Sequence, residues 1–265
     1  MEFIQIDQGK CTHCGICVRE CPGVLTLGDA GPQLNPDYTC IACGHCVAVC
    51  PNAAIDNVLT PLKCQEPLAE KLTSEAAAQF LRSRRSVRGY KTKTVAREKL
   101  QQLVDMARFA PTAGNRQGLS FIVVEDPTVL KRATELTVAW MEAQPSRQTK
   151  WDFNKQIRLY REQGLDSVLR GAPHLVLATA AKGFVRAREN TIFSLAYLEL
   201  YAPTLGLGSC WAGLLEMCLF DGYEPLLELF GVEADREITG AVMVGYPQYR
   251  YQRLVDRNPL SLSWR

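Results

Sequence analysis

The chain has 265 residues, a formal net charge of +2, 47% hydrophobic residues and 22% charged residues. This length allows one large domain or two smaller ones with a buried core, and the composition excludes a disordered or collagen-like chain. No apolar run approaches the roughly 18 residues that a membrane-spanning helix needs. No secretory signal opens the sequence, and the near-neutral charge gives no indication of nucleic-acid binding. We therefore expect a cytoplasmic globular protein without a membrane or nucleic-acid partner.

Cysteine is the unusual residue, because eight of the eleven cysteines lie between Cys11 and Cys50. In a reducing compartment, clustered thiols indicate metal rather than disulfides. The spacing C-x2-C-x2-C-x3-C-P occurs twice, from Cys11 to Pro22 and from Cys40 to Pro51. Three thiolates on such a loop can converge on three corners of an iron–sulfur cube, while the fourth points toward another cube. Zinc is the alternative, but zinc ribbons use two CxxC pairs and no third cysteine in register.

These motifs resemble the bacterial two-cluster ferredoxins over roughly residues 1–60. The resemblance implies two 4Fe-4S clusters with crossed ligation: Cys11, Cys14, Cys17 and Cys50 for one, and Cys40, Cys43, Cys46 and Cys21 for the other. Short strands are expected at 3–6 and 54–58. We interpret residues 1–62 as a ferredoxin-type domain that the clusters hold together, because so few large apolar residues cannot build a core.

Residues 63–72 are expected to form a linker, since two prolines lie between Thr60 and Pro67 and the composition changes there. Cys64, within the linker, is expected to be a small buried or partly exposed thiol rather than a ninth ligand.

The remainder, residues 73–265, alternates helical periodicity with short apolar strands. Thr73 and Ser74 predict the start of a helix. Further helices are expected at about 95–109, 127–140, within 148–168 and at 188–205, and strands at 120–124, 174–180 and 238–244. The pattern predicts an α+β domain with a central mixed sheet flanked by helices.

The usual signatures of catalysis are absent from this part of the sequence, which has no GxGxxG after a strand, no P-loop and no GxSxG. Its one histidine, His174, lies in an apolar strand and is expected to be structural. Four segments do suggest a ligand: an arginine-rich loop at 82–90, a turn at 110–117, a glycine-rich stretch at 206–213, and Gly245-Tyr246-Pro247 followed by a basic tail.

In this order the four segments resemble the FMN-dependent nitroreductase family over about residues 73–265. The resemblance implies a homodimer with FMN at the interface. By motif position, the residues implied around FMN are Arg84, Arg85, Ser86, Arg88, Asn115, Gln117, Trp211, Ala212, Gly213, Leu214, Arg253 and Arg257. The resemblance also implies that Asn115 and Gln117 of one subunit lie near the flavin ring bound by the partner subunit.

A variable cap is expected at about 141–169, where the family carries its insertion. Trp151, Phe153 and Tyr160 either stack on a flat substrate there or pack against the domain. Cys210 and Cys218 are expected to be small apolar residues rather than redox groups.

Together these features predict a flavo-iron–sulfur oxidoreductase in which the cofactors carry the chemistry, and no catalytic acid is assigned. The fused ferredoxin-type domain favours ferredoxin or another low-potential donor, and a small organic acceptor such as a nitroaromatic, quinone or enone. Two alternatives stay open. One is an enzyme driven by NAD(P)H or by substrate oxidation, with the clusters as the electron exit. The other is a redox relay or sensor without catalysis.

Overall fold

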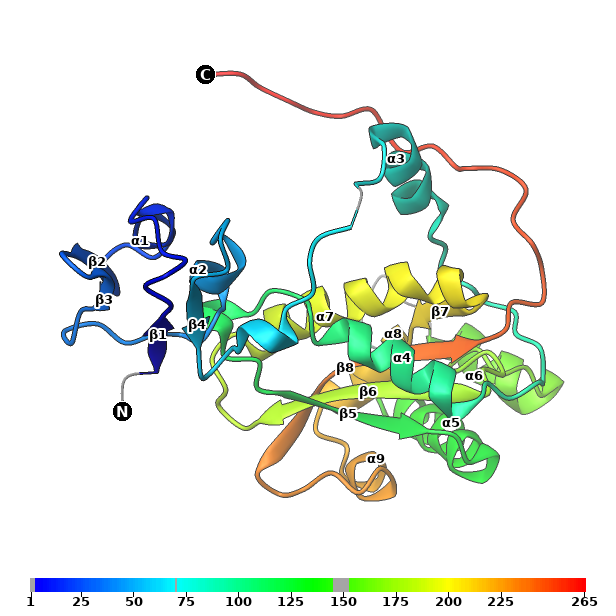
Figure 1. Cartoon of the computed structure of the whole chain (residues 1–265). Coiled ribbons are helices and arrows are strands. Elements are labelled where there is room, and N and C mark those ends of the chain that lie inside the picture. The colour runs from blue at the N-terminus through cyan, green and yellow to red at the C-terminus, as the bar shows by residue number, and fades with distance from the viewer. Residues whose placement is uncertain (1–2, 70, 145–152) are drawn as a thin grey trace. The chain divides into compact units, whose positions relative to one another are not determined.

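The structure is a computed structural model that describes residues 3–69, 71–144 and 153–265 (Figure 1). Its contacts divide the chain into two compact units. The first comprises Met1–Leu72 with Gly114–Arg116, and the second comprises Thr73–Ala113 with Gln117–Arg265. None of the helices in the described ranges combines the length and apolar character of a membrane-spanning segment.

The first unit is built from two small antiparallel pairs and two short helices. Strand β1 (Ile4–Ile6) pairs with β4 (Ile55–Asn57), and β2 (Leu25–Gly28) pairs with β3 (Gly31–Leu34). The helices are α1 (Ile16–Glu20) and α2 (His45–Ala48), followed by the 3-10 turn η1 (Leu62–Cys64). Strands β1 and β4 fall in the segments where the sequence predicts strands. The β2–β3 hairpin was not expected, because its residues show little apolar alternation.

The second unit contains a four-stranded sheet in the order β5-β6-β8-β7. The strands are β5 (Leu119–Val124), β6 (His174–Ala181), β7 (Gly208–Trp211) and β8 (Arg236–Gly245). All three ladders are antiparallel. Within the described part of this unit, parallel pairing is confined to an isolated bridge between Ser86 and Ser209.

Helices cover both faces of this sheet (Figure 1). The helices that pack against it are α4 (Arg97–Ala107), α5 (Pro127–Ala143), α6 (Phe153–Gln163), α7 (Ala187–Tyr201), α8 (Gly213–Phe220) and α9 (Glu224–Leu229), and the 3-10 turns are η2 (Ala113–Asn115) and η3 (Ala202–Leu205). Helix α3 (Ser74–Ser83) has no buried residue and does not cover the sheet. The α3 helix begins where expected, because the Thr73 hydroxyl accepts a hydrogen bond from the Ala76 amide at 3.2 Å.

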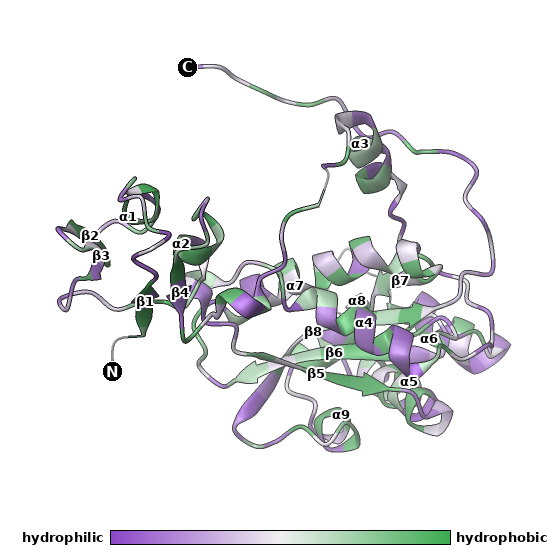
Figure 2. Cartoon of the chain, viewed as in Figure 1, coloured by the Kyte–Doolittle hydropathy of each residue, from purple (hydrophilic) through white to green (hydrophobic). Residues whose placement is uncertain are grey.

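Alternate residues of the central strands enter two different cores. Leu175 and Leu177 of β6 pack with residues of α5, α8 and α9, whereas Val176 and Ala178 pack with residues of α4 and α7. This explains why the segment 174–180 is apolar throughout rather than alternating. Figure 2 shows the same apolar character along the sheet strands.

Several boundaries differ from the expected ones. The described helix within 148–168 is α6, and residues 145–152 lie outside the described ranges. The helix expected at 188–205 is α7 followed by η3, because Pro203 follows its last turn and lacks a backbone donor. Strand β7 coincides with the glycine-rich stretch that the sequence suggested as a ligand segment.

Candidate functional site

The two cysteine motifs adopt the same backbone conformation. In the first loop, His13 and Gly15 have positive φ values of 54° and 70°, and in the second loop Ala42 and Gly44 have values of 52° and 74°. Each glycine directly precedes a short helix, α1 or α2. The left-handed conformation costs a glycine little, so the sequence repeat reproduces one loop shape twice.

The structure gathers the cysteines of the first unit into two groups that each draw on both motifs. One cavity is lined by Cys11, Cys14, Cys17 and Cys50. In the other group, burial, together with the neighbouring charges of Cys21, Cys40 and Cys43, raises the pKa of the Cys46 thiol to about 11. These are the two sets that the ferredoxin resemblance implies.

The surroundings of the sulfur atoms suit an iron–sulfur cluster. The Ala42 amide lies 3.3 Å from the Cys40 sulfur and the Ala54 amide lies 3.3 Å from the Cys50 sulfur, both as donors. The Asn57 amide nitrogen lies 3.9 Å from the Cys40 sulfur. Hydrogen bonds of this kind stabilise cluster sulfur. Each set supplies four thiolates, which is the number of cysteine ligands that a 4Fe-4S cluster takes.

The arginine-rich loop makes its hydrogen bonds and its ion pair with residues of the second unit. Arg84 Nη1 lies 3.6 Å from Glu199 Oε1, and the Ser209 hydroxyl donates to the same carboxylate oxygen at 3.2 Å. Burial raises the pKa of Glu199, while Arg84 opposes that shift. Arg85 donates to the carbonyl oxygens of Arg82 and Arg84 at 2.8 Å. The backbone of Ser86 pairs with Ser209 in the isolated bridge.

A cavity of about 290 Å³ brings several of the implied flavin residues together. Arg88 lines it beside Trp211, Gly213 and Leu214, which lie where β7 ends and α8 begins. Ala212, between these, is buried and its amide donates to the Ala241 carbonyl at 2.9 Å. The β7–α8 turn therefore presents its backbone and the Arg88 guanidinium to one cavity.

Two features of this cavity fit a flat polar cofactor. A Cβ added to Gly213 would meet nothing within 4 Å, so space lies open against this backbone. The Ser167 side chain also lines the cavity, and its buried hydroxyl has no hydrogen-bond partner in the described residues. A buried unpaired hydroxyl is costly unless a ligand satisfies it.

The sequence analysis did not single out three polar residues of this lining: Gln156, Ser167 and Arg170. The signal that could have found the last two is a short polar turn, Asp166-Ser167 followed by Arg170-Gly171, directly before a buried strand.

Other implied residues lie elsewhere. Neither Asn115 nor Gln117 is among the residues that line the cavity beside Arg88 and Trp211. Arg253 and Arg257 are exposed in the C-terminal segment, which leaves the sheet as an extended chain (Figure 1). The Arg253 carbonyl accepts a hydrogen bond from Arg85 at 3.4 Å. These four positions stay predictions.

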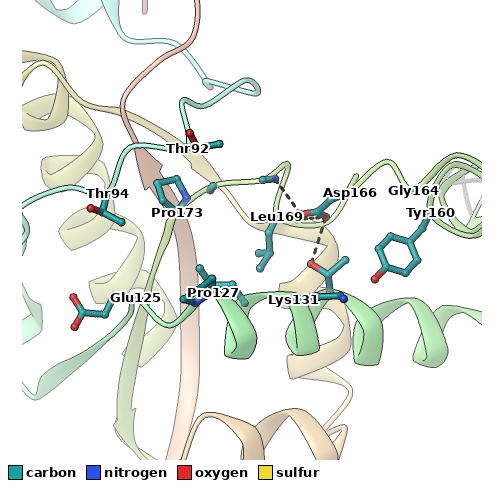
Figure 3. A pocket seen from close by; sticks show the side chains of 14 residues that line it. Thr92, Thr94, Glu125, Pro127, Lys131, Tyr160, Gly164, Asp166, Leu169 and Pro173 are labelled. Carbon is teal, nitrogen blue, oxygen red and sulfur yellow. Dashed lines mark hydrogen bonds between the residues drawn. The ribbon is translucent and has the colours of Figure 1, made fainter.

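The aromatic residues of the expected cap, 141–169, have different surroundings. Phe153 is buried and its ring meets Trp140 edge-on at 5.7 Å, so of the two alternatives it packs against the domain. Tyr160 lines a separate cavity of about 520 Å³ beside Asp166 and Lys131, as Figure 3 shows. None of the residues implied around FMN lines that second cavity. Trp151 lies outside the described residues.

The remaining singled-out residues are mostly structural. Cys218 is fully buried and Cys210 is 5% exposed, and burial raises both thiol pKa values. His174 is buried, and its Nε2 accepts a hydrogen bond from the Val95 amide at 2.8 Å. Cys64 is exposed, more so than expected.

Comparisons with known proteins agree with both units. The nitroreductase family matches residues 81–246 and the 4Fe-4S dicluster domain matches residues 3–51. An Archaeoglobus fulgidus protein described as an NADH dehydrogenase/NAD(P)H nitroreductase is 26% identical over 66% of this chain and 87% of its own. An FMN reductase [NAD(P)H] of Bacillus subtilis is 29% identical over 48% of this chain and 62% of its own.

Solved structures agree on the fold. A nitroreductase of Desulfitobacterium hafniense with bound FMN superposes with a TM-score of 0.59, at 18% identity, over 73% of this chain and all of its own. A nitroreductase of Bacteroides fragilis with bound FMN gives 0.56 at 20% identity, over 71% of this chain and 98% of its own. The expected α+β fold and the expected enzyme class are both confirmed. The chain belongs to the nitroreductase family, as an FMN-dependent oxidoreductase that also carries an N-terminal 4Fe-4S dicluster domain.

Proposed function

We propose that this protein passes electrons between two 4Fe-4S clusters and FMN in the cytoplasm, and reduces a small organic acceptor such as a nitroaromatic, quinone or enone. The observation that carries the proposal is the combination of two cysteine sets that each draw on both motifs with a separate cavity lined by Arg88 and the β7–α8 turn. When bound, the clusters exchange single electrons, and FMN exchanges one or two.

The chain's own residues would bind and orient these groups. In the first motif, the left-handed residues His13 and Gly15 lie in the loop that brings Cys11, Cys14 and Cys17 around one cavity. In the other unit, the β7–α8 backbone offers an open surface at Gly213, and Arg88 supplies a positive charge beside it. Buried Glu199 holds Arg84 close to β7, which supports a role for this loop in ordering the cavity rim.

A homodimer is part of the proposal. Helix α7 exposes large apolar side chains, with Ile192 43%, Phe193 51% and Tyr197 39% exposed. Phe193 and Tyr197 are four residues apart and therefore share one helix face. An apolar stripe of this kind is costly in water and is typical of an interface between subunits.

The electron donor separates two candidate functions. A fused ferredoxin-type domain favours ferredoxin or another low-potential single-electron donor. The names of the two curated relatives, which both include NAD(P)H, favour a nicotinamide donor, with the clusters as an electron exit.

Anaerobic stopped-flow spectroscopy distinguishes these candidates. The reconstituted full chain is mixed separately with NADH, NADPH and reduced ferredoxin, and flavin and cluster absorbance are followed. Fast flavin reduction by ferredoxin alone supports the low-potential donor. Flavin bleaching by NADH or NADPH within milliseconds supports the second candidate. Failure of the reconstituted chain to retain flavin contradicts both.

A further inference from the structure

The loop from Asp166 to Gly171 is organised around one carboxylate. Asp166 accepts hydrogen bonds from the backbone amides of Val168, Leu169 and Gly171 at 2.9, 2.9 and 3.0 Å. The Thr134 hydroxyl of α5 donates to it at 3.4 Å (Figure 3). These bonds tie the loop to itself and to α5, so the residues between are held in place rather than left to fluctuate.

The loop presents Ser167 and Arg170 to the 290 Å³ cavity. Ser167 is 8% exposed, and its hydroxyl has no partner within the described part of the chain. Buried hydroxyls normally find a partner in protein or water. A ligand in the cavity is the natural partner for this one.

Arg170 has a backbone conformation that arginine rarely adopts. Its φ is +56°, in the left-handed region that favours glycine, and the next residue is Gly171. Strain of this kind persists where the surrounding structure enforces it and is concentrated at ligand sites. Here the Asp166 hydrogen bonds on both sides of Arg170 enforce it.

The charge of the cavity is one-sided. Arg88 and Arg170 both line it, and no aspartate or glutamate does so among the described residues. The rest of the lining is largely apolar, with Leu214, Met217 and Met243. Two guanidinium groups beside apolar walls favour an anionic oxygen group, which they can bind through paired N–H donors.

We propose that Ser167 and Arg170 form an oxyanion subsite in this cavity, with Arg170 pairing with the anionic oxygens and Ser167 donating a hydrogen bond. The proposal rests on the proposed function, because it places the subsite in the cavity assigned to flavin. A phosphate of FMN and a carboxylate of the acceptor share this chemistry, and the experiment below separates them.

Arg170→Gly is the decisive variant, because glycine adopts a positive φ without strain. It should fold at least as stably as the wild type while losing the guanidinium. Arg186→Gly is the matched control. Arg186 also has a positive φ, of 65°, but it is exposed and paired with Glu189 outside the cavity. Arg170→Lys keeps the positive charge and should restore part of the binding.

Two binding measurements identify the source of the oxyanion. The first titrates flavin-free full-length protein with FMN and with riboflavin, followed by flavin fluorescence. The second titrates the FMN-loaded protein with benzoate and with benzyl alcohol, followed by flavin absorbance. We expect Arg170→Gly to weaken either FMN or benzoate about 10- to 100-fold, and to leave the uncharged analogue of that pair unchanged. Ser167→Ala should weaken the same ligand by a smaller factor.

The FMN phosphate is the source of the oxyanion if Arg170→Gly weakens FMN but not riboflavin. An acceptor carboxylate is the source if the variant weakens benzoate but not benzyl alcohol. The inference is overturned if Arg170→Gly changes neither pair beyond Arg186→Gly. If wild-type protein binds no FMN, the proposed function fails and the subsite fails with it. If the wild-type protein binds FMN and Arg170→Gly changes neither affinity, only the subsite proposal is overturned.

Discussion

Arg188 of α7 and Glu216 of α8 form a two-pronged ion pair, with nitrogen–oxygen distances of 3.2 and 3.1 Å. The Arg188 guanidinium also lies 5.2 Å from the Trp211 ring centroid and 4.7 Å from that of Phe220. Glu216 accepts the Ala241 amide of β8 at 2.8 Å. This pair therefore fastens the β7–α8 turn, which lines the candidate flavin cavity, to the central sheet.

Replacing Arg188 with alanine is expected to lower the free energy of unfolding by about 2–3 kcal/mol, because it leaves the buried Glu216 carboxylate without its cation. Denaturant unfolding of the second unit at pH 7 measures this. Arg132→Ala is the control, since its pair with Glu135 is largely exposed and should contribute less than about 1 kcal/mol. Equal losses in the two variants would show that burial of Glu216 does not matter.

His174 is expected to make stability depend on pH. Burial lowers its pKa below the ordinary value of 6.5, so the unfolded chain binds a proton more readily. The free energy of unfolding should therefore keep its full value above pH 6.5 and decrease as the pH falls below 6.5. Protonation would also remove the Nε2 lone pair that accepts from the Val95 amide.

His174→Leu tests this role. It leaves the Val95 amide buried and unpaired, so we expect a loss of about 1–3 kcal/mol near neutral pH. Unfolding curves between pH 5 and 8 should also lose the histidine part of the pH dependence. An unchanged slope in the leucine variant would mean that another group titrates.

The crossed grouping of cysteines predicts how iron is lost. Cys14→Ala and Cys50→Ala should each remove the same cluster, so the double variant should lose no more iron than either single one. Cys14→Ala combined with Cys21→Ala should remove both clusters. Iron analysis with electron paramagnetic resonance measures this. Additive loss in the Cys14 and Cys50 pair would contradict the grouping that the first cysteine cavity indicates.

Asn57 is expected to raise the potential of one cluster. Its side chain is 1% exposed, and its amide lies 3.9 Å from the Cys40 sulfur. The corresponding position of the first motif, seven residues after the fourth cysteine, is Gly28, which has no side chain. A donor stabilises the reduced cluster more, because that form carries more negative charge on sulfur.

Asn57→Ala should therefore lower the reduction potential of the cluster that Cys40 ligates by ~30–59 mV. This corresponds to a decrease of about 3- to 10-fold in the equilibrium constant for one-electron reduction. A redox titration followed by electron paramagnetic resonance measures both clusters in one sample. Asn35→Ala, a partly buried asparagine of the same unit, is the control. A shift of both clusters, or of neither, would contradict the assignment.

The sequence by itself predicted the main elements of the second unit and, through the ferredoxin resemblance, the two cysteine sets. The repeated spacing of the cysteines carries that resemblance, and the mostly apolar run 174–180 predicts a buried strand. Short elements such as β7 and the β2–β3 hairpin escaped because their residues carry no clear period.

Only the tertiary structure decided which polar residues share a cavity. Arg84 and Arg88 are four residues apart in one motif, yet Arg84 lies against buried Glu199 while Arg88 lines the candidate flavin cavity. Ser167 and Arg170 carry no motif at all, and they reach this cavity because Asp166 bends the loop that holds them. Local spacing sets the shape of a loop, but the neighbours of its side chains come from segments far away in the chain, and these meet only when the sheet and its helices pack.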